Sequence, residues 1–534
     1  MLRLACGFLV WLVGATAATA QIDCARINSR AVLEASEFDD ILDCVKWDPE
    51  LIGAPDASGH NLLMTAVSSN IDPFDLDALL NQIPADQLDT VLEAKDQRGW
   101  SLGHIAAAEA IDPGVIFVLS SYGVSFLEET ASKGGWLDMG TMPLHVAAAR
   151  EDGWPIIAAL LAIGMESYPD QNDHSPLEVA LERPETSANA ILLSEGRWPA
   201  IYMNNFEPVL ASSNVDCTNF LTTNFFSTAN EADVAACLSG ETKFESVDQD
   251  GNTILHLAAA HSKDARIIDL ILSQAVDPKA LVEKRNSSKM TALHLAAKDG
   301  PSPDAVAHLL AWGADPNALF LIDSSWISKN RGISALHLAA SRNDDLREDI
   351  ILNLLAFRAD TMVQDVDART ENSSATIGRT PLHRAVLRPD RYIELMLLEA
   401  QFSQEGLLGG AFRALVRGHL VKQIGDDEGR TVLHMSASRE ADFVSLDMLL
   451  WYGFSVDEGD NQGNTPLMFA AQNFTDADNF RYLLNSSKSP CKKSKSGVTV
   501  EGALRGNTAL MEAGAGGKDG TALSLLAEVK IRCP

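Results

Sequence analysis

Residues 248–259 read Asp-Gln-Asp-Gly-Asn-Thr-Ile-Leu-His-Leu-Ala-Ala, and the second half of this stretch recurs along the chain. The close copies begin at Thr291, Ser334, Thr380, Thr431, Met142 and Thr465. Weaker copies begin at Asn61, Ser101, Ser175 and Thr508. A short motif that returns so often, at intervals close to 33 residues or somewhat longer, predicts a solenoid of stacked units rather than several separate globular domains.

Each copy has the local chemistry of two short helices preceded by a turn. Asp-x-x-Gly is a tight-turn signal in which glycine takes the left-handed conformation. Thr or Ser is a good N-cap, and Pro directly after it fits the first helical turn. Eighteen residues after the Thr position comes an apolar pair, as in Leu160-Leu161, Leu309-Leu310, Leu449-Leu450 and Leu483-Leu484. We place this pair on a second helix, antiparallel to the first. One such unit cannot bury its own apolar face, so neighbouring units must stack to form the core.

The pattern resembles the ankyrin repeat, whose consensus contains Thr-Pro-Leu-His-x-Ala-Ala and a later Leu-Leu-x-x-Gly-Ala-Asp. Met142-Pro-Leu-His145-Val-Ala-Ala and the turn Gly313-Ala314-Asp315 carry the resemblance most clearly. The resemblance implies an all-α ankyrin-repeat solenoid and a protein-binding function. It also implies that the repeated histidines are structural and that the turn tips and first helices form the binding surface.

The cysteines indicate two capped arrays. Cys24 and Cys44 are separated by 20 residues, as are Cys217 and Cys237, and the surrounding segments resemble each other. Six cysteines allow fifteen pairings, but this repetition favours local pairs, with Cys491 and Cys533 left for the third bridge. Each of the first two pairs precedes a run of repeats. We therefore expect each pair to staple an N-terminal capping hairpin, where stacking is missing on one side.

These observations predict three segments. Residues 1–20 are expected to be a secretory signal peptide, because Arg3 precedes an apolar run and Ala18-Thr19-Ala20 fits a cleavage site. Residues 21–200 are expected to form a first array with cap helices at 24–45. Residues 201–534 are expected to form a second array with cap helices at 217–238. A join is expected near Trp198-Pro199. The protein is thus expected to be exported, either periplasmic or secreted, and an even number of mature cysteines fits an oxidising compartment.

Composition narrows the function further. The formal net charge of −31 disfavours nucleic acid as a partner, and no later segment is long and apolar enough to predict membrane insertion. Neither Cys-x-x-Cys, His-Glu-x-x-His nor Gly-x-Ser-x-Gly occurs in the mature chain. We therefore predict no catalytic residue, no cofactor and no metal site, and we expect a non-enzymatic monomer.

The favoured function is a protein-interaction scaffold for one or more unidentified partner proteins. The alternatives are a secreted effector aimed at host proteins, a periplasmic stress-protective factor and, least favoured, a hydrolase. The expected binding residues lie at the turn tips of the second array: Gln249, Asp250, Asn252, Lys289, Met290, Ile333, Arg379, Glu428, Arg430, Gln462 and Asn464.

Several segments interrupt the repeat and could contact a partner or simply be solvated. Residues 401–424 include a basic amphipathic stretch, and residues 485–505 include Lys492, Lys493 and Lys495. Trp136 and Trp326 lie in further insertions, where packing onto the solenoid is the favoured role over an interface contact.

Overall fold

The structure is a computed structural model of the chain. It describes residues 24–130, 140–182, 187–194, 197–205, 209–212, 215–238, 244, 246–320, 332–365, 378–388, 390–404, 424–439, 442–507 and 521–533. The predicted signal peptide at 1–20 lies outside the described residues, as do Trp136, Trp326 and most of 401–424. Over the described ranges the chain is helical, and isolated β-bridges pair Lys95 with Ser101 and Phe320 with Ile333.

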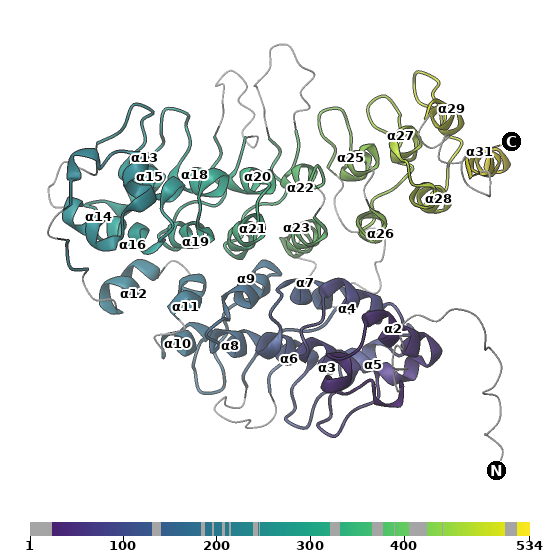
Figure 1. Ribbon diagram of the computed structural model, residues 1–534, viewed down its shortest axis with the longest axis horizontal. Coiled ribbons are helices and arrows are strands. Elements are labelled where there is room, and N and C mark those ends of the chain that lie inside the picture. The colour runs from purple at the N-terminus through teal and green to yellow at the C-terminus, as the bar shows by residue number, and fades with distance from the viewer. Residues whose placement is uncertain are drawn as a thin grey trace, which may run out of the picture.

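The first array is a row of helix pairs that begins with a short cap (Figure 1). The cap consists of η1 (Cys24–Arg26), α1 (Arg30–Leu33), α2 (Phe38–Trp47) and η2 (Pro49–Ile52). The first helices of the pairs are α3 (Leu62–Ser68), α6 (Leu102–Glu109), α8 (Pro143–Ala148) and α10 (Pro176–Leu181). The second helices are α4 (Pro73–Leu80), α7 (Gly114–Ser121), α9 (Trp154–Ala162) and α11 (Ser187–Leu193). An additional helix, α5 (Leu88–Leu92), follows α4, and α12 (Trp198–Asn205) follows α11.

The second array repeats the same plan over a longer stretch (Figure 1). Its cap consists of η4 (Cys217–Asn219), α13 (Thr223–Thr228) and α14 (Glu231–Leu238). The first helices are α15 (Ile254–His261), α18 (Ala292–Asp299), α20 (Ala335–Ala340), α22 (Pro381–Ala385), α25 (Val432–Ser438), α27 (Pro466–Asn473) and α29 (Val500–Gly506). The second helices are α16 (Arg266–Gln274), α19 (Pro303–Ala311), α21 (Arg347–Ala356), α23 (Arg391–Gln404), α26 (Phe443–Trp451), α28 (Ala477–Ser486) and α31 (Thr521–Arg532). An additional helix, α17 (Pro278–Glu283), follows α16 just as α5 follows α4.

Disulfides hold the two caps and the C-terminal end. The structure contains Cys24–Cys44, Cys217–Cys237 and Cys491–Cys533, the three predicted pairings. Each cap packs on the first helix pair of its own array: α1 contacts α3 and α2 contacts α4, while α13 contacts α15 and α14 contacts α16. The predicted fold class, an all-α solenoid of two arrays with disulfide-stapled caps, is confirmed.

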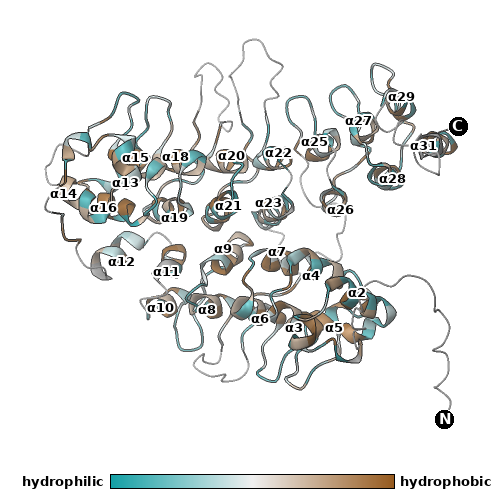
Figure 2. Cartoon of the chain, in the orientation of Figure 1, coloured by the Kyte–Doolittle hydropathy of each residue, from teal (hydrophilic) through white to brown (hydrophobic). Residues whose placement is uncertain are grey.

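The two arrays pack against each other through their second helices, which the sequence analysis did not foresee. α9 packs on α21, α7 on α23, α11 on α19 and α12 on α16 (Figure 1). The chain therefore folds back on itself, so that the turns and first helices of the two arrays point in opposite directions. Figure 2 shows hydrophobic residues on α7 and α9, which lie along this interface.

One helix face decides where the arrays meet. We define the outward positions of a second helix as the residues two before and two after the first residue of its apolar pair. These residues are four apart and so lie on one face of the helix. In α9 they are Ala158 and Ala162. In α21, whose apolar pair Leu354-Leu355 comes twenty residues after Ser334, they are Leu352 and Ala356; all four are at most 9% exposed. In α28, which has no helix of the first array against it, they are the partly exposed Arg481 and the exposed Asn485.

A buried polar cluster closes the interface at the join. The indole N–H of Trp198 on α12 donates to Asp269 Oδ1 at 2.9 Å, and the indole of Trp312 donates to the same oxygen at 2.6 Å. His308 Nδ1 lies 2.7 Å from Asp269 Oδ2. Asp269 is an outward position of α16, so the first array reaches the second through a hydrogen bond to a buried carboxylate. Burial alone lowers the pKa of His308, but the charge and hydrogen bond of Asp269 outweigh burial and raise it.

The last repeat corrects one part of the sequence analysis. Its first helix is α29, whose N-cap Thr499 accepts a hydrogen bond from the Gly502 N–H. A repeat therefore begins at Thr499. The copy predicted at Thr508 lies outside the described residues and stays a prediction. The segment before Thr499 is not an insertion: Ser494 and Val498 close a turn of the same kind as in other repeats. The motif was missed because Val500-Glu-Gly-Ala contains neither the proline nor the histidine of the other copies.

Candidate protein-binding surface

Several of the turns before the first helices are rigid fingers built on one aspartate. Asp248 Oδ1 accepts the backbone N–H groups of Asp250 and Asn252, at 2.9 and 2.7 Å. Gly251 between them has φ = +75°, a conformation that glycine adopts without the steric penalty of a side chain. Asp426 and Asp460 make the same pair of bonds in later repeats.

Neighbouring fingers are also bonded to each other. The Ser287 N–H donates to the Asp250 carbonyl at 2.9 Å. The Asn461 N–H donates to Glu428, and the Lys495 N–H donates to Gln462, both at 2.8 Å. A finger therefore cannot move without breaking hydrogen bonds to the next one. The row presents its side chains on a preformed backbone, which reduces the entropy lost when a partner binds.

The repeated histidines connect each first helix to the following finger. In His256, Nδ1 lies 2.8 Å from Thr253 Oγ1 and accepts the Thr253 backbone N–H, while Nε2 lies 3.1 Å from the Met290 carbonyl. A carbonyl only accepts, so Nε2 carries the proton and the ring is neutral. The same arrangement recurs at His104, His145, His294, His337, His383 and His434.

Burial keeps these rings neutral. It lowers the pKa of His294, His337, His383 and His434 to about 4, and it also lowers the pKa of His104, His145 and His256. Their donors and acceptors are used within the solenoid. Among the described residues, no group of three or more His, Cys, Asp or Glu side chains could hold a metal ion, and no described helix is long and apolar enough to cross a membrane.

The predicted binding residues divide into three groups by exposure. The exposed residues at the finger tips are Gln249, Asp250, Lys289, Glu428 and Gln462. The partly buried residues are Asn252, Met290, Arg379, Arg430 and Asn464. Ile333 is 3% exposed, and its backbone pairs with Phe320 in an antiparallel bridge, so its side chain is not accessible to a partner. The prediction therefore fails for Ile333 and remains a prediction for the others.

Three of the partly buried residues have a structural role in their own finger. The amides of Asn252 and Asn464 donate to Asp248 and Asp460. Arg430 forms ion pairs with Asp426 at 3.0 Å and Glu428 at 3.1 Å. Substituting these residues would loosen the finger as well as change the surface, so they cannot serve as clean probes of binding.

The residue directly after each repeated histidine was missed by the sequence analysis. In the second array this position holds Leu257, Leu295, Leu338, Arg384 and Met435, and the equivalent residue in the repeat that begins at Thr465 is Phe469, which follows Met468 in place of histidine. Leu295 and Leu338, in consecutive repeats, and Phe469, three repeats further along, are partly exposed beside the fingers. We call these three residues the apolar row. The signal was available, because this is the one position of Leu-His-x-Ala-Ala where the copies differ strongly in chemistry. We call the exposed finger tips together with this row the finger surface.

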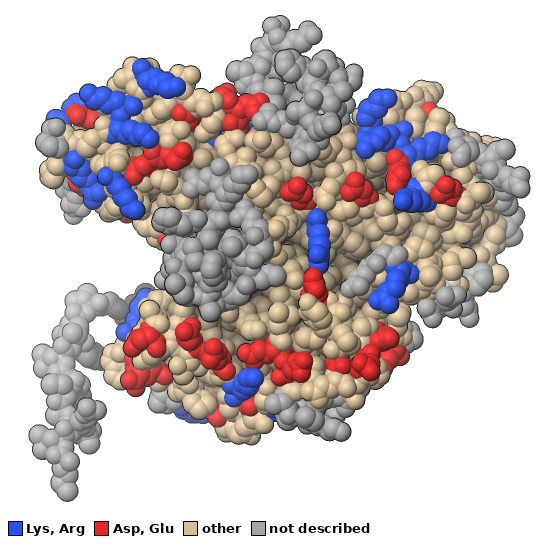
Figure 3. Space-filling view, turned by 180° about the vertical axis from the view of Figure 1, so that it is seen from behind, with Lys and Arg blue, Asp and Glu red and all other residues tan. Residues whose placement is uncertain are grey.

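Charge distinguishes the two arrays. From behind, acidic side chains form a row over the first array, whereas lysines and arginines gather at both ends of the second (Figure 3). The second array therefore has more varied charge than the net charge of −31 suggests.

The family model described as ankyrin repeats (3 copies) matches two segments of the chain, residues 225–320 and 403–496. The matched segments lie in the second array, where the histidine bonds and the finger-to-finger bonds are most regular. The chain contains ankyrin repeats. Ankyrin repeats are a protein–protein interaction module, and proteins built from them are generally scaffolds without catalytic activity.

Proposed function

We propose that this ankyrin-repeat protein is an exported, non-enzymatic scaffold that holds a partner protein on its finger surface. The observation that carries the proposal is the row of fingers bonded to one another, with Gln249, Lys289 and Gln462 exposed at the tips. Mixed polar, charged and apolar groups on a rigid backbone are what a specific interface requires. The apolar row of Leu295, Leu338 and Phe469 adds apolar surface that a bound partner can bury, which the polar finger tips do not offer.

Export is the second part of the proposal and is supported by cysteine chemistry. All six mature cysteines are paired, and disulfides persist in oxidising compartments but are rare in the cytosol. Sequencing of the mature N-terminus tests this part. We expect the protein to begin at Gln21, and an intact Met1 on cytoplasmic protein with free thiols would contradict it.

Site-specific cross-linking tests the surface. A photoreactive amino acid is placed at Gln249, Lys289 or Gln462, and at Asn485 on α28 as a matched control that is equally exposed but on a second helix. In the native cell, we expect one shared adduct from the three finger positions and none from Asn485. An adduct from Asn485 alone would place the partner on the opposite side of the array and overturn the proposal.

A further inference from the structure

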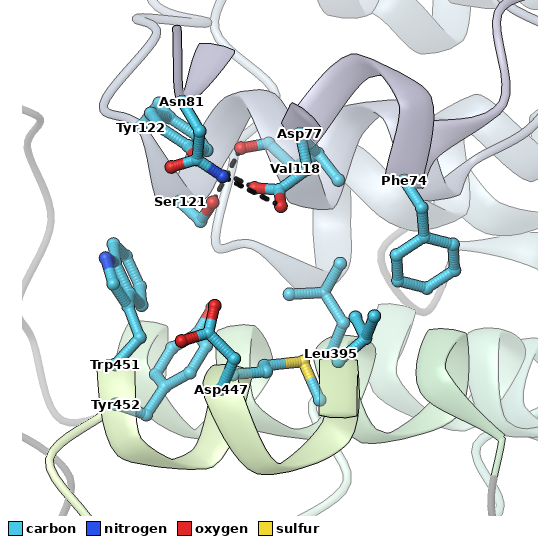
Figure 4. Close-up of a pocket in the computed structure, with 12 residues that line it drawn as sticks. Phe74, Asp77, Asn81, Val118, Ser121, Tyr122, Leu395, Asp447, Trp451 and Tyr452 are labelled. Carbon is cyan, nitrogen blue, oxygen red and sulfur yellow. Dashed lines mark hydrogen bonds between the residues drawn. The ribbon is translucent and has the colours of Figure 1, made fainter. Parts of the chain in front are cut away.

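The interface between the arrays opens into a cleft at the end far from the join. Its walls are α4 and α7 of the first array and α23 and α26 of the second (Figure 4). Phe74, Val118 and Tyr122 line one side, and Leu395, Met448 and Trp451 line the other. The space between them is ≈ 550 Å³, counting the part that is open to solvent.

The cleft exists because the outward positions here are not small or aliphatic. In α4 they are Asp77 and Asn81, and in α26 they are Asp447 and Trp451, and all four line the cleft. Where alanine and leucine occupy these positions, as in α9 and α21, the helices meet closely. Carboxylates on facing helices repel each other and retain water, so the two arrays separate here.

The two carboxylates have hydrogen bonds but no cation. Asp77 accepts from the Tyr122 hydroxyl at 2.7 Å and from the Asn81 amide at 3.2 Å. Asp447 accepts from the Tyr482 hydroxyl. Within the described part of the chain, neither carboxylate forms an ion pair with a lysine, arginine or histidine. Burial raises the pKa of Asp77, and the charge of Asp447 raises it further. A positive charge between the two would therefore be stabilised by both.

Aromatic rings complete the site. The rings of Tyr122 and Trp451, one from each array, lie with their centroids 6.5 Å apart beside the carboxylates (Figure 4). Electron-rich ring faces attract cations, most strongly those of tryptophan and tyrosine. Next to the cleft, Phe443 is 48% exposed, and the centroid of its ring lies 4.6 Å from that of Tyr482, the residue that donates to Asp447, with the two rings tilted by 60°. Phe443 thus offers apolar contact to residues that flank the cation, which favours a polypeptide over a free small ion.

We propose that this cleft is a second binding site, distinct from the finger surface, which takes a lysine or arginine side chain from a partner polypeptide. Asp77 and Asp447 bind the charged group, Tyr122 and Trp451 contact it through their ring faces, and Phe443 contacts an apolar neighbour in the partner. The site requires both arrays, because each supplies one carboxylate and one ring.

The test measures binding of labelled peptides to the full mature chain by fluorescence anisotropy. The probe is a short peptide with one central lysine between leucines, and the matched peptide has norleucine instead of lysine, which keeps the aliphatic stem without the charge. We expect the norleucine peptide to bind at least tenfold more weakly. We also expect the variant D77N/D447N to weaken lysine-peptide binding tenfold and to leave the melting temperature within a few degrees.

The control variant is E93Q/E283Q, which also removes one exposed carboxylate from each array, at the ends of α5 and α17. This variant should bind the lysine peptide like the wild type. Trp451→Leu should weaken binding of the lysine peptide more than binding of the norleucine peptide, because leucine keeps an apolar wall but removes the aromatic ring. Equal weakening by E93Q/E283Q, or equal binding of the two peptides, would show only general attraction to an acidic protein and would overturn the proposal.

Discussion

The two ends of the interface between the arrays both have an aspartate on a second helix, but the arrays are joined at one end and separated at the other. At the join, Trp198 of the first array donates to the buried Asp269 of the second, and Trp312 and His308 bond to the same carboxylate. At the far end, Asp77 and Asp447 have no such cationic or indole partner among the described residues, and the arrays leave a cleft. Both ends have an aspartate at an outward position of a second helix. A buried carboxylate therefore joins the arrays only where donors from neighbouring helices satisfy it.

The centre of the interface, between α9 and α21, should be the most sensitive to change. Leu352→Asp would place an unpaired charge at a fully buried outward position, and we expect a loss of about 3 kcal/mol or more in unfolding free energy. Small-angle scattering should also show a larger radius of gyration as the arrays separate.

Asn485→Asp on α28 is the matched control for Leu352→Asp. It introduces the same side chain at the equivalent outward position, but the site is exposed and adjoins Arg532. We expect a change within about 0.5 kcal/mol. Equal losses from both variants, measured by urea unfolding, would refute the assignment of outward positions.

The join should be the next most sensitive. Trp198→Phe keeps the aromatic ring but removes one donor from Asp269, and we expect a loss of about 2 kcal/mol because a buried acceptor loses a partner. Trp47→Phe, at a residue 78% exposed, is the control and should be neutral. Limited proteolysis should cut Trp198→Phe faster near the join if the hydrogen bond holds the arrays together.

The join should also weaken as the pH rises. The pKa of His308 is above its usual value in the folded protein, so folding favours the protonated ring. That stabilisation is complete below the pKa of an unfolded histidine, about 6.5, and is lost as the pH rises through the folded pKa. In urea unfolding, wild type should exceed His308→Gln in stability by more at pH 6 than at pH 9. If the stability difference between wild type and His308→Gln were constant or grew with pH, the ion pair between His308 and Asp269 would not contribute to the free energy of unfolding.

The end of the interface with the cleft should be the part whose substitutions change the free energy of unfolding least. Asp447→Ala removes a carboxylate that is exposed and has no ion pair among the described residues, so we expect the unfolding free energy to change by less than about 0.5 kcal/mol. A loss comparable to that of Trp198→Phe would show that the cleft is part of the stabilising interface, which would remove the contrast between the two ends.

Local chemistry explains why most of the fold could be predicted from the sequence. The N-cap at Thr253, the turn at Asp248–Gly251 and the Leu-Leu pairs act over a few residues, so each copy of the motif determines its own helix pair. The disulfide pairs were predictable because the caps repeat the same spacing and each staple lies within one hairpin. The copy at Thr499 was missed where the motif is weakest. Ile333 was wrongly expected at the surface, because its position in the turn does not show that the folded chain buries its side chain.

The sequence by itself determined the repeat, the caps and the positions of the fingers, because all of them rest on contacts within one unit or between consecutive units. Only the tertiary structure decided that the arrays pack back to back, since Leu352 and α9 are far apart in the chain and nothing local requires them to meet. The sequence did contain one indication of this packing. α9 is apolar on all sides, and a helix of that kind must be covered on every face. Which helix covers it depends on the whole path of the chain between them, and so do the carboxylates and rings that come to face each other across the cleft.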